Sequence, residues 1–329
     1  MANTLTPNFD YTYDGITSTE VFYKPTVMTP DVLQIFKVLT GIKSKQQLNL
    51  VAPLSNITKA DQGCGTTETG TGIQITNRTL ETCSFEVFLS QCYDVFEGNV
   101  MENLLKSGNG TPDLTGTGIQ TILENVIKDG MRRDAFKFFS FGDTDSVNTN
   151  LNVCDGLWTR LIAGVASYEV DRVSTIGSNL SQTANQRALD YFKLLFEGAD
   201  ITLKQMPVGE KKFFVTGTIF ENYLTTLETL NNAEGGWKIV QDGLPRAFYR
   251  GIEVVPIYAW DSIITEFSLG SPNRILYTTP ANHVIGVERA QDQSEMEIWY
   301  EKKDKKVYIR GMYRMGYNYV QNDLQAISY

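Results

Sequence analysis

The sequence predicts an α+β protein in which a globular body carries extended parts that cannot fold alone. The 329 residues are 42% apolar, which suffices for a sizeable core and about two domains. Apolar residues recur at helical spacing between about 112 and 139, whereas strand-like runs are frequent elsewhere. Residues 1–28 and 46–89 have few apolar side chains for their length, so we expect them to project from the body.

The composition argues against several classes of function. The chain has 29 basic and 38 acidic residues, a formal net charge of -9, and no run of Lys or Arg longer than two. This pattern argues against sequence-specific nucleic-acid binding. No stretch reaches the ~20 apolar residues of a membrane helix, and the N-terminus lacks the basic and apolar regions of a secretion signal. We therefore expect a soluble protein without membrane contacts.

The N-terminal third is predicted to contain an arm, a short helix and a hairpin. The first 28 residues show no helical or strand periodicity, which indicates an extended arm. Thr29 and Pro30 are typical of a helix start, and apolar residues at helical spacing continue to Gly41. Strand-like runs at 48–54 and 72–80 bracket a glycine cluster and predict a long hairpin.

A long amphipathic helix is predicted from about Pro112 to Phe139. Its apolar face consists of Ile119, Ile122, Leu123, Val126, Ile127 and Met131. Because this whole face is expected to be buried, aspartate at positions 122 and 126 should unfold the protein.

The rest of the chain is predicted to form a compact α/β unit and a final hairpin. Helices and strands alternate between 150 and 285, which favours a mixed sheet. We expect helices after Cys154, at 188–198 and from Thr218, and strands at 211–216, 251–255 and 274–278. Residues 296–300 and 307–309 alternate apolar and polar around a lysine-rich turn, which predicts a hairpin.

The four cysteines do not have the spacing of a zinc site. Cys64, Cys83, Cys92 and Cys154 include no CxxC pair. Such usage is ordinary for a protein made in a reducing compartment, where cysteines act as small apolar residues. The alternative is a disulfide between Cys64 and Cys83, which flank the glycine-rich turn and could face each other across the hairpin.

A catalytic or metal site has little support. His283 is the single histidine and follows a Pro-Ala-Asn turn, so a surface or turn position is expected. The acidic loop at 143–148 departs from a calcium loop because Val147 lacks a ligand oxygen. Two acidic pairs could act as acid and base, but exposed acids are usually solvating: Glu221 with Glu228, and Asp242 with Glu253. The sequence predicts no catalytic residue, cofactor or metal.

Aromatic residues are numerous, with 16 Tyr, 17 Phe and 4 Trp. Several lie in the arm and the C-terminal tail. Aromatic side chains on a segment without its own core indicate that the segment docks on a neighbour, whereas core packing is the ordinary alternative for the tail.

Three motifs, in their order along the chain, resemble a known family. They are Asn152-Val-Cys-Asp-Gly-Leu-Trp158, then Asp242-Gly-Leu244 followed by Phe248 to Pro256, and finally Ile298 to Tyr317. Together with the order of arm, hairpin, long helix, α/β unit and closing hairpin, they resemble the major capsid proteins of tailed bacteriophages, which have the HK-ninety-seven fold. The last segment is similar to that of phages with Bacteroidetes-type hosts.

The resemblance implies a division of the chain. Residues 1–45 would form the N-terminal arm and a short helix, and 46–89 the extended hairpin loop. Residues 90–149 and 286–329 would form the peripheral domain with the spine helix, and 150–285 the axial domain. It also implies hexamers and pentamers that tile an icosahedral shell around double-stranded DNA, assembled in the host cytoplasm and present in the virion.

The resemblance also implies partners and contact residues. The sequence passes from Met1 directly into the arm, so we expect a separate scaffolding protein. A portal protein and decoration proteins are the further expected partners. The candidates for contacts between subunits are Tyr11, Tyr13, Phe22, Tyr23, Asn56, Cys64, Thr66, Thr69, Ile73, Tyr317 and Tyr319. No lysine or asparagine is assigned to a covalent cross-link.

Two other readings stay open. A shell similar to encapsulins would enclose cargo proteins instead of DNA. A soluble hydrolase with an Asp/Glu pair in the α/β half would show two acids with perturbed titration in one pocket. A tail or receptor-binding protein would show β-repeats or a trimeric coiled coil, which the sequence lacks.

Overall fold

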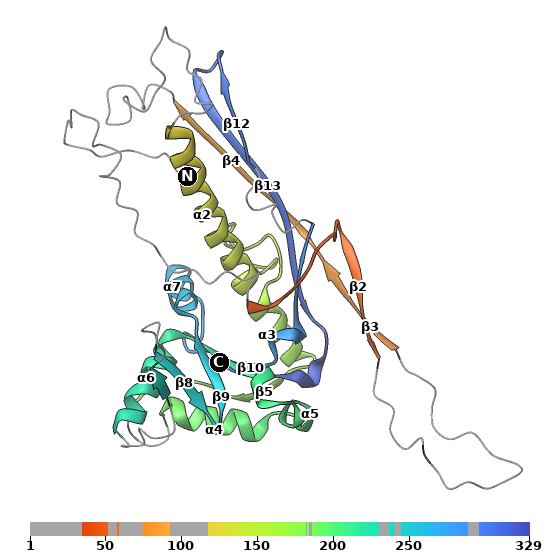
Figure 1. The fold of residues 1–329 in the computed structure, drawn as a ribbon, viewed down its shortest axis with the longest axis vertical. Helices are drawn as coiled ribbons and strands as arrows, with labels where there is room; N and C mark the ends of the chain where they lie inside the picture. Colours follow the sequence, from red (N-terminus) through yellow and green to blue (C-terminus); the bar gives the residue numbers. More distant parts are fainter. Residues whose placement is uncertain are drawn as a thin grey trace, which may run out of the picture.

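The molecule is elongated, with a long ribbon and helix at one end and an α/β unit at the other (Figure 1). The computed structural model of the chain describes residues 35–51, 58, 75–92, 118–181, 183, 186–229, 237–239, 245–288 and 296–329. The predicted arm and the tip of the predicted hairpin lie outside these residues.

The long ribbon is a β-sheet, and strand β13 (Lys306–Tyr319) lies at its centre. One of its edges pairs antiparallel with β4 (Cys83–Cys92). Its other edge pairs first with β12 (Met296–Glu301), which confirms the predicted C-terminal hairpin, and then with β11 (His283–Val287). With a further strand that pairs with β11, this sheet has five strands, two from the first third of the chain and three from its C-terminal part.

Helix α2 (Gly118–Phe141) runs along the ribbon, as Figure 1 shows. Leu123, Ile127 and Met131 are buried against it, whereas Val126 is 44% exposed. The prediction that Val126 belongs to the buried face is therefore wrong. The ribbon covers a narrow row of positions spaced by four residues, and Val126 lies about 100° around the helix from Ile127.

The prediction of a helix that continues to Gly41 is wrong for residues 37–39. Residues Lys37–Leu39 form strand β1, which pairs in parallel with β11. Phe36 lies next to it and packs its ring 5.2 Å from Phe139 and 5.2 Å from Phe214. Strand pairing and this aromatic contact outweigh a helical pattern that is only three turns long.

The α/β unit contains a mixed sheet with helices on its faces. Its strand order is β5-β14-β10-β6-β9-β8-β7. The strands are β5 (Asp171–Ser174), β6 (Lys212–Val215), β7 (Trp237–Ile239), β8 (Pro245–Tyr249), β9 (Ile252–Pro256), β10 (Ile275–Thr278) and β14 (Gln325–Ser328). The helices are α3 (Leu157–Ala166), α4 (Ala188–Gly198), α5 (Ile201–Gln205), α6 (Gly217–Thr229) and α7 (Tyr258–Glu266). The predicted helix at 188–198 and strands near 212, 252 and 275 are confirmed.

Alternation along the central strands divides the core in two. In β6, Phe213 and Val215 pack in one apolar cluster with α4 and α6, and Phe214 belongs to the other. That second cluster continues through α7 and α3 to α2 and β13. The ribbon and the α/β unit are therefore joined by a shared core, as expected of strands that are buried on both faces.

A two-stranded hairpin projects from the side of the ribbon (Figure 1). Strands β2 (Lys45–Val51) and β3 (Ile75–Glu81) pair antiparallel, which confirms the strands of the predicted hairpin with shifted bounds. Among the described residues, a small core lies at its root and consists of Ile42, Leu48, Leu80 and Val284. Because an isolated two-stranded hairpin is marginally stable, contacts beyond this core must help to stabilise β2 and β3.

The prediction that His283 lies at the surface or in a turn is wrong. The residue opens β11 and is fully buried. Its Nδ1 lies 2.6 Å from the Tyr317 hydroxyl and its Nε2 lies 2.9 Å from the Thr278 hydroxyl. Both ring nitrogens thus have a partner, which is how a neutral imidazole is accommodated in a core.

This burial should make the protein less stable in mild acid. Desolvation lowers the pKa of His283 to about 3, from 6.5 in an exposed side chain. Below pH 6.5 the unfolded chain binds a proton that the folded chain excludes, so the free energy of unfolding should fall by about 1.4 kcal/mol per pH unit. Urea unfolding at pH 7.0, 6.0 and 5.0 measures this slope. Because the chain has one histidine, His283→Gln should flatten it, and an unchanged slope would contradict the assignment.

The cysteine predictions are also corrected. Cys83 forms a disulfide with Cys154, with 6.0 Å between their Cα atoms, and not with Cys64, which lies outside the described residues. Cys83 belongs to β4 rather than to the hairpin, and the turn before α3 brings Cys154 next to it. Sequence spacing gave no sign of this pairing because 71 positions separate the two residues.

Candidate assembly surface

The outward face of the ribbon carries an exposed aromatic cluster. Side chains alternate along β13, so Val307 and Ile309 face the core while Tyr308 and Met312 face away from α2. Phe88 of β4 and Trp299 of β12 lie on the same outward face. We call Phe88, Trp299, Tyr308 and Met312 the ribbon face; the exposed fractions of Phe88, Met312 and Trp299 are 56%, 54% and 38%.

The three rings of the ribbon face contact one another. Tyr308 stacks with Phe88 and with Trp299, with ring centroids 5.6 Å apart in each pair. The Tyr308 hydroxyl donates a hydrogen bond to Asp304 at 3.0 Å, and this bond raises the pKa of Tyr308. Rings held in place in this way offer contact area with little further loss of side-chain entropy on docking.

An ion pair lies beside the aromatic rings on the same face. Arg310 Nε lies 2.8 Å from Glu86 Oε1, on the two strands that also carry Tyr308 and Phe88. Aromatic side chains, Met and Arg on one exposed face are typical of surfaces that bind another protein. The ribbon face therefore has the composition of a docking surface.

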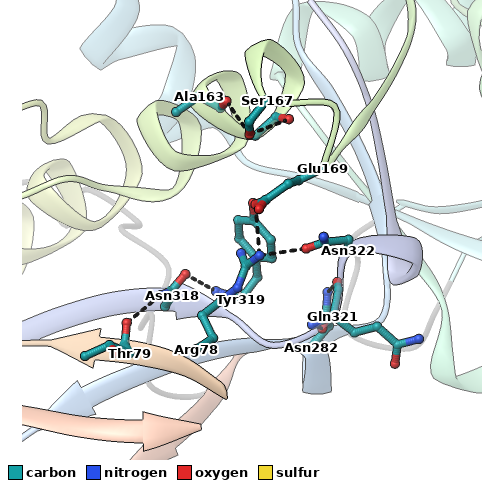
Figure 2. Close-up of polar contacts among 11 residues, drawn as sticks. Arg78, Thr79, Ala163, Ser167, Glu169, Asn282, Asn318, Tyr319, Gln321 and Asn322 are labelled. Atoms are coloured by element: carbon teal, nitrogen blue, oxygen red, sulfur yellow. Dashed lines mark hydrogen bonds and ion pairs between the residues drawn. The ribbon is translucent and has the colours of Figure 1, made fainter. Parts of the chain in front are cut away.

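A second feature is the polar clamp at the root of the hairpin, shown in Figure 2. The Arg78 guanidinium of β3 lies 4.1 Å from the centre of the Tyr319 ring. Its Nη2 donates to Glu169 at 2.9 Å and to Asn322 at 2.8 Å. One side chain thus connects the hairpin to the loop after α3, to the end of β13 and to the turn that follows.

Two further hydrogen bonds strengthen the clamp. Asn318 Nδ2 donates to the Thr79 carbonyl at 2.7 Å, and the Tyr319 hydroxyl donates to Glu169 at 3.2 Å. A polar cavity of about 490 Å³ lies beside these residues, lined among others by Asp155, Thr159 and Arg160. The hairpin is held at its base by polar contacts next to water, rather than by a large apolar core.

Removing the Arg78 side chain should loosen the hairpin. Arg78→Ala deletes a charge-assisted network, so we expect a loss of about 1–3 kcal/mol and faster amide exchange in β2 and β3. Hydrogen–deuterium exchange with mass spectrometry measures this effect. Lys45→Ala is the matched control, because the Lys45–Glu81 ion pair of the same hairpin is largely exposed and should contribute less than 1 kcal/mol. Equal effects of the two variants would contradict the role of the clamp.

The structure describes two of the predicted contact residues and places both in the interior. Tyr317 and Tyr319 are each 2% exposed. Tyr317 packs edge-on against Phe139 and bonds to His283, while Tyr319 lies beneath Arg78. Both rings are buried by contacts within the chain, so neither belongs to the docking surface. The other candidates lie outside the described residues: Tyr11, Tyr13, Phe22, Tyr23, Asn56, Cys64, Thr66, Thr69 and Ile73.

Sequence reasoning missed the ribbon face, although a signal existed. The alternation that identifies β12 and β13 uses Ile298, Tyr300, Val307 and Ile309 as the apolar set. The complementary set should be polar in a strand with one solvated face, yet it contains aromatic residues. Aromatic residues in that set are the sequence signal of an exposed apolar face.

Three of the acids considered for a catalytic or metal site have a structural partner. The Tyr258 hydroxyl donates to Glu221 at 2.7 Å, and Lys212 pairs with Glu253 at 3.0 Å. In the loop after α2, Asp143 accepts a hydrogen bond from the amide of Asp145. Asp242 lies outside the described residues. Within the part of the chain that the structure describes, no group of three or more His, Cys, Asp or Glu residues could hold a metal ion, and no helix combines the length and apolarity needed to cross a bilayer.

Solved phage capsid structures share this fold. A structure of Mycobacterium phage Bobi matches with a TM-score of 0.55 at 11% identity, over 97% of this chain and 94% of that chain. The satellite phage P4 procapsid that includes the size determination (Sid) protein matches with a TM-score of 0.53 at 10% identity, over 91% and 94%. The capsid of an empty GTA particle matches with a TM-score of 0.54 at 13% identity, over 93% and 98%.

These matches extend over almost the whole of each chain, so the shared fold is not limited to one part. No protein-family model matches the sequence, and no curated protein does so either. The chain therefore has the mixed helix-and-sheet fold of phage capsid structures.

Proposed function

We propose that this chain is the major capsid protein of a tailed phage, with the HK-ninety-seven fold. It assembles as hexamers and pentamers into an icosahedral head shell around double-stranded DNA. The observation that carries the proposal is the ribbon face, an ordered and exposed aromatic cluster on a fold shared with capsid structures.

The shape of the molecule supports assembly into a shell. In the described part of the projecting hairpin the apolar core is small and lies at the root, and the ribbon face leaves three stacked rings in contact with water. Both features cost solubility or stability in an isolated molecule, and contacts with neighbouring copies offset that cost. Weak contacts repeated over many copies hold an assembly together through multivalency.

The parts of the fold receive roles in this proposal. The N-terminal arm within residues 1–45 and the extended hairpin loop within residues 46–89 reach neighbouring subunits. Residues 90–149 and 286–329, which include α2, β12 and β13, form the peripheral domain. Strands β1 and β4 of the first two ranges pair within the same sheet. Residues 150–285, with most of the seven-stranded sheet, form the axial domain near the symmetry axes. Scaffolding, portal and decoration proteins are the expected partners during assembly in the host cytoplasm, and the virion is the final location.

The role is structural rather than catalytic, and the charge of the chain fits it. A net charge of -9 repels the phosphate backbone, so the inner wall of a shell would not bind the packaged DNA tightly. No sequence-specific contact to DNA is required in this proposal.

Electron microscopy of the expressed chain tests the proposal. The chain is produced alone and together with neighbouring phage genes, and particles are examined by negative staining and light scattering. Closed shells, or rings of five and six subunits, are expected. A strictly monomeric product in the presence of a scaffolding protein would contradict the proposal. The nucleic-acid content of purified phage particles separates a DNA container from a compartment that encloses proteins.

A further inference from the structure

The root of the hairpin is anchored on two sides. On one side lies the polar clamp centred on Arg78. On the other side, Thr82 joins the hairpin to β4, and Cys83, the next residue, is bonded to Cys154. Reversible polar contacts and a covalent bond thus restrain the same segment.

The two cysteines are brought together by tightly packed backbone. Cys83 pairs with Met315 of β13, and Cys154 Sγ lies 3.9 Å from the Met315 carbonyl oxygen. Gly316, next along β13, lies so close to the Glu81 carbonyl that a side chain there would clash. Strand pairing and close packing, rather than the disulfide itself, therefore hold the two sulfur atoms in reach of each other.

The turn that carries Cys154 is equally constrained. The Gly156 amide donates to the Gly142 carbonyl at 2.8 Å, which closes the loop between α2 and α3. A side chain at position 142 would clash with the Cys154 carbonyl. Because the loop is fixed independently, bonding Cys154 to Cys83 ties the hairpin root to the spine helix through a rigid turn.

We infer that the Cys83–Cys154 pair is a redox-controlled lock on the hairpin root, open as two thiols in the host cytoplasm and closed as a disulfide in the particle outside the cell. The inference rests on the proposed function, which places assembly in a reducing compartment and the finished particle in an oxidising one. While the pair is reduced, the polar clamp, the small apolar core and strand pairing restrain the root without a covalent bond, so the hairpin can adjust its angle more freely as neighbours are added.

Closure of the lock is a thiol–disulfide exchange with a low-molecular-weight disulfide such as oxidised glutathione. Cys83 is partly exposed and Cys154 is buried, so the Cys83 thiolate attacks the small disulfide and releases one small thiolate. The Cys154 thiolate then attacks the Cys83 sulfur of the mixed disulfide and releases the second. Two protein thiols lose two electrons and two protons, and the small disulfide gains them as two thiols.

The first test measures when the bond forms. Cells that contain the full-length protein are lysed in urea with N-ethylmaleimide, so that buried thiols are also alkylated before exposure to air, and a second sample is treated with oxidised glutathione after purification. Peptide mapping without reductant should find Cys83 and Cys154 alkylated in the first sample and linked to each other in the second. A linked peptide in the quenched lysate would overturn the inference.

The second test measures the effect on the hairpin. Amides of β2 and β3 should exchange on the order of tenfold more slowly in oxidised than in dithiothreitol-treated protein. Cys154→Ser should lose this difference. Cys92→Ser should keep it, because Cys92 is an exposed free cysteine on β4, the strand that also carries Cys83. Equal exchange in oxidised and reduced wild-type protein would overturn the inference.

Electron microscopy of the same samples separates the two proposals. Shells of Cys154→Ser whose hairpin no longer responds to oxidant would support the lock and the shell role together. Shells of wild-type protein with no redox response would overturn the lock alone. If no sample forms particles, the shell role is contradicted, and the exchange measurements on the unassembled chain still decide the lock.

Discussion

Phe88→Glu combined with Trp299→Glu should leave a folded chain that no longer forms shells. Both side chains are exposed, so the change removes ring contacts at the surface without opening a cavity in the core. Aromatic residues at the centre of an interface contribute about 2 kcal/mol or more each, roughly 30-fold in affinity for each contact. Because each subunit would repeat the loss, particles should disappear from electron micrographs and light scattering should report small species.

The matched control is Val147→Glu. Val147 is an isolated apolar side chain on the loop after α2 and is fully exposed. The Val147→Glu variant adds a negative charge away from the ribbon face, so this variant should form normal shells. Circular dichroism should give similar melting temperatures for both variants and the wild type. Normal shells from the double variant would show that the ribbon face is not an assembly surface.

Met131→Asp should unfold the protein, whereas Val126→Asp should be tolerated. Met131 is 2% exposed in the core between α2 and the ribbon, so an aspartate there would be buried without a partner. Such a change costs about 3–5 kcal/mol, a large part of the stability of a typical domain. Val126 lies on the exposed side of the same helix, and a charge there should change the free energy of unfolding by less than about 0.5 kcal/mol.

Urea unfolding followed by circular dichroism measures both variants. The comparison also tests whether one narrow face of α2 is buried or a wider face that includes Val126. If Val126→Asp is as damaging as Met131→Asp, then the ribbon or another part of the protein covers a wider face of α2 than the structure describes. Insoluble Met131→Asp with soluble Val126→Asp is the expected outcome during expression.

Periodicity predicted the elements that are regular over many residues. The long helix, the helix at 188–198 and the closing hairpin each repeat their pattern often enough to exclude the other type of element. The helix predicted at residues 37–39 was wrong because the pattern there is short. Their three positions fit a helical pattern, but the free edge of β11 offered backbone partners, and such an edge is invisible in the sequence.

Features that depend on distant residues could not be predicted. Cys83 meets Cys154 only because β4 and the turn before α3 both lie against Met315. His283 is buried because residues more than 30 positions away supply a hydroxyl and aromatic rings around it. The ribbon face could have been predicted from the sequence, since Trp299 and Tyr308 occupy strand positions that alternation assigns to solvent.

The position of β13 also has a consequence for the order of folding. It pairs with β4, and Arg310 and Asn322 reach Glu86 and Arg78 across 224 and 244 positions of sequence. Contacts between such distant positions form slowly, because a long loop must close before they can be made. On a ribosome, the ribbon face and the anchored hairpin cannot exist until β13 has emerged. Under the proposed function, a nascent chain would therefore lack the ribbon face, and a shell would grow only from subunits whose synthesis is complete.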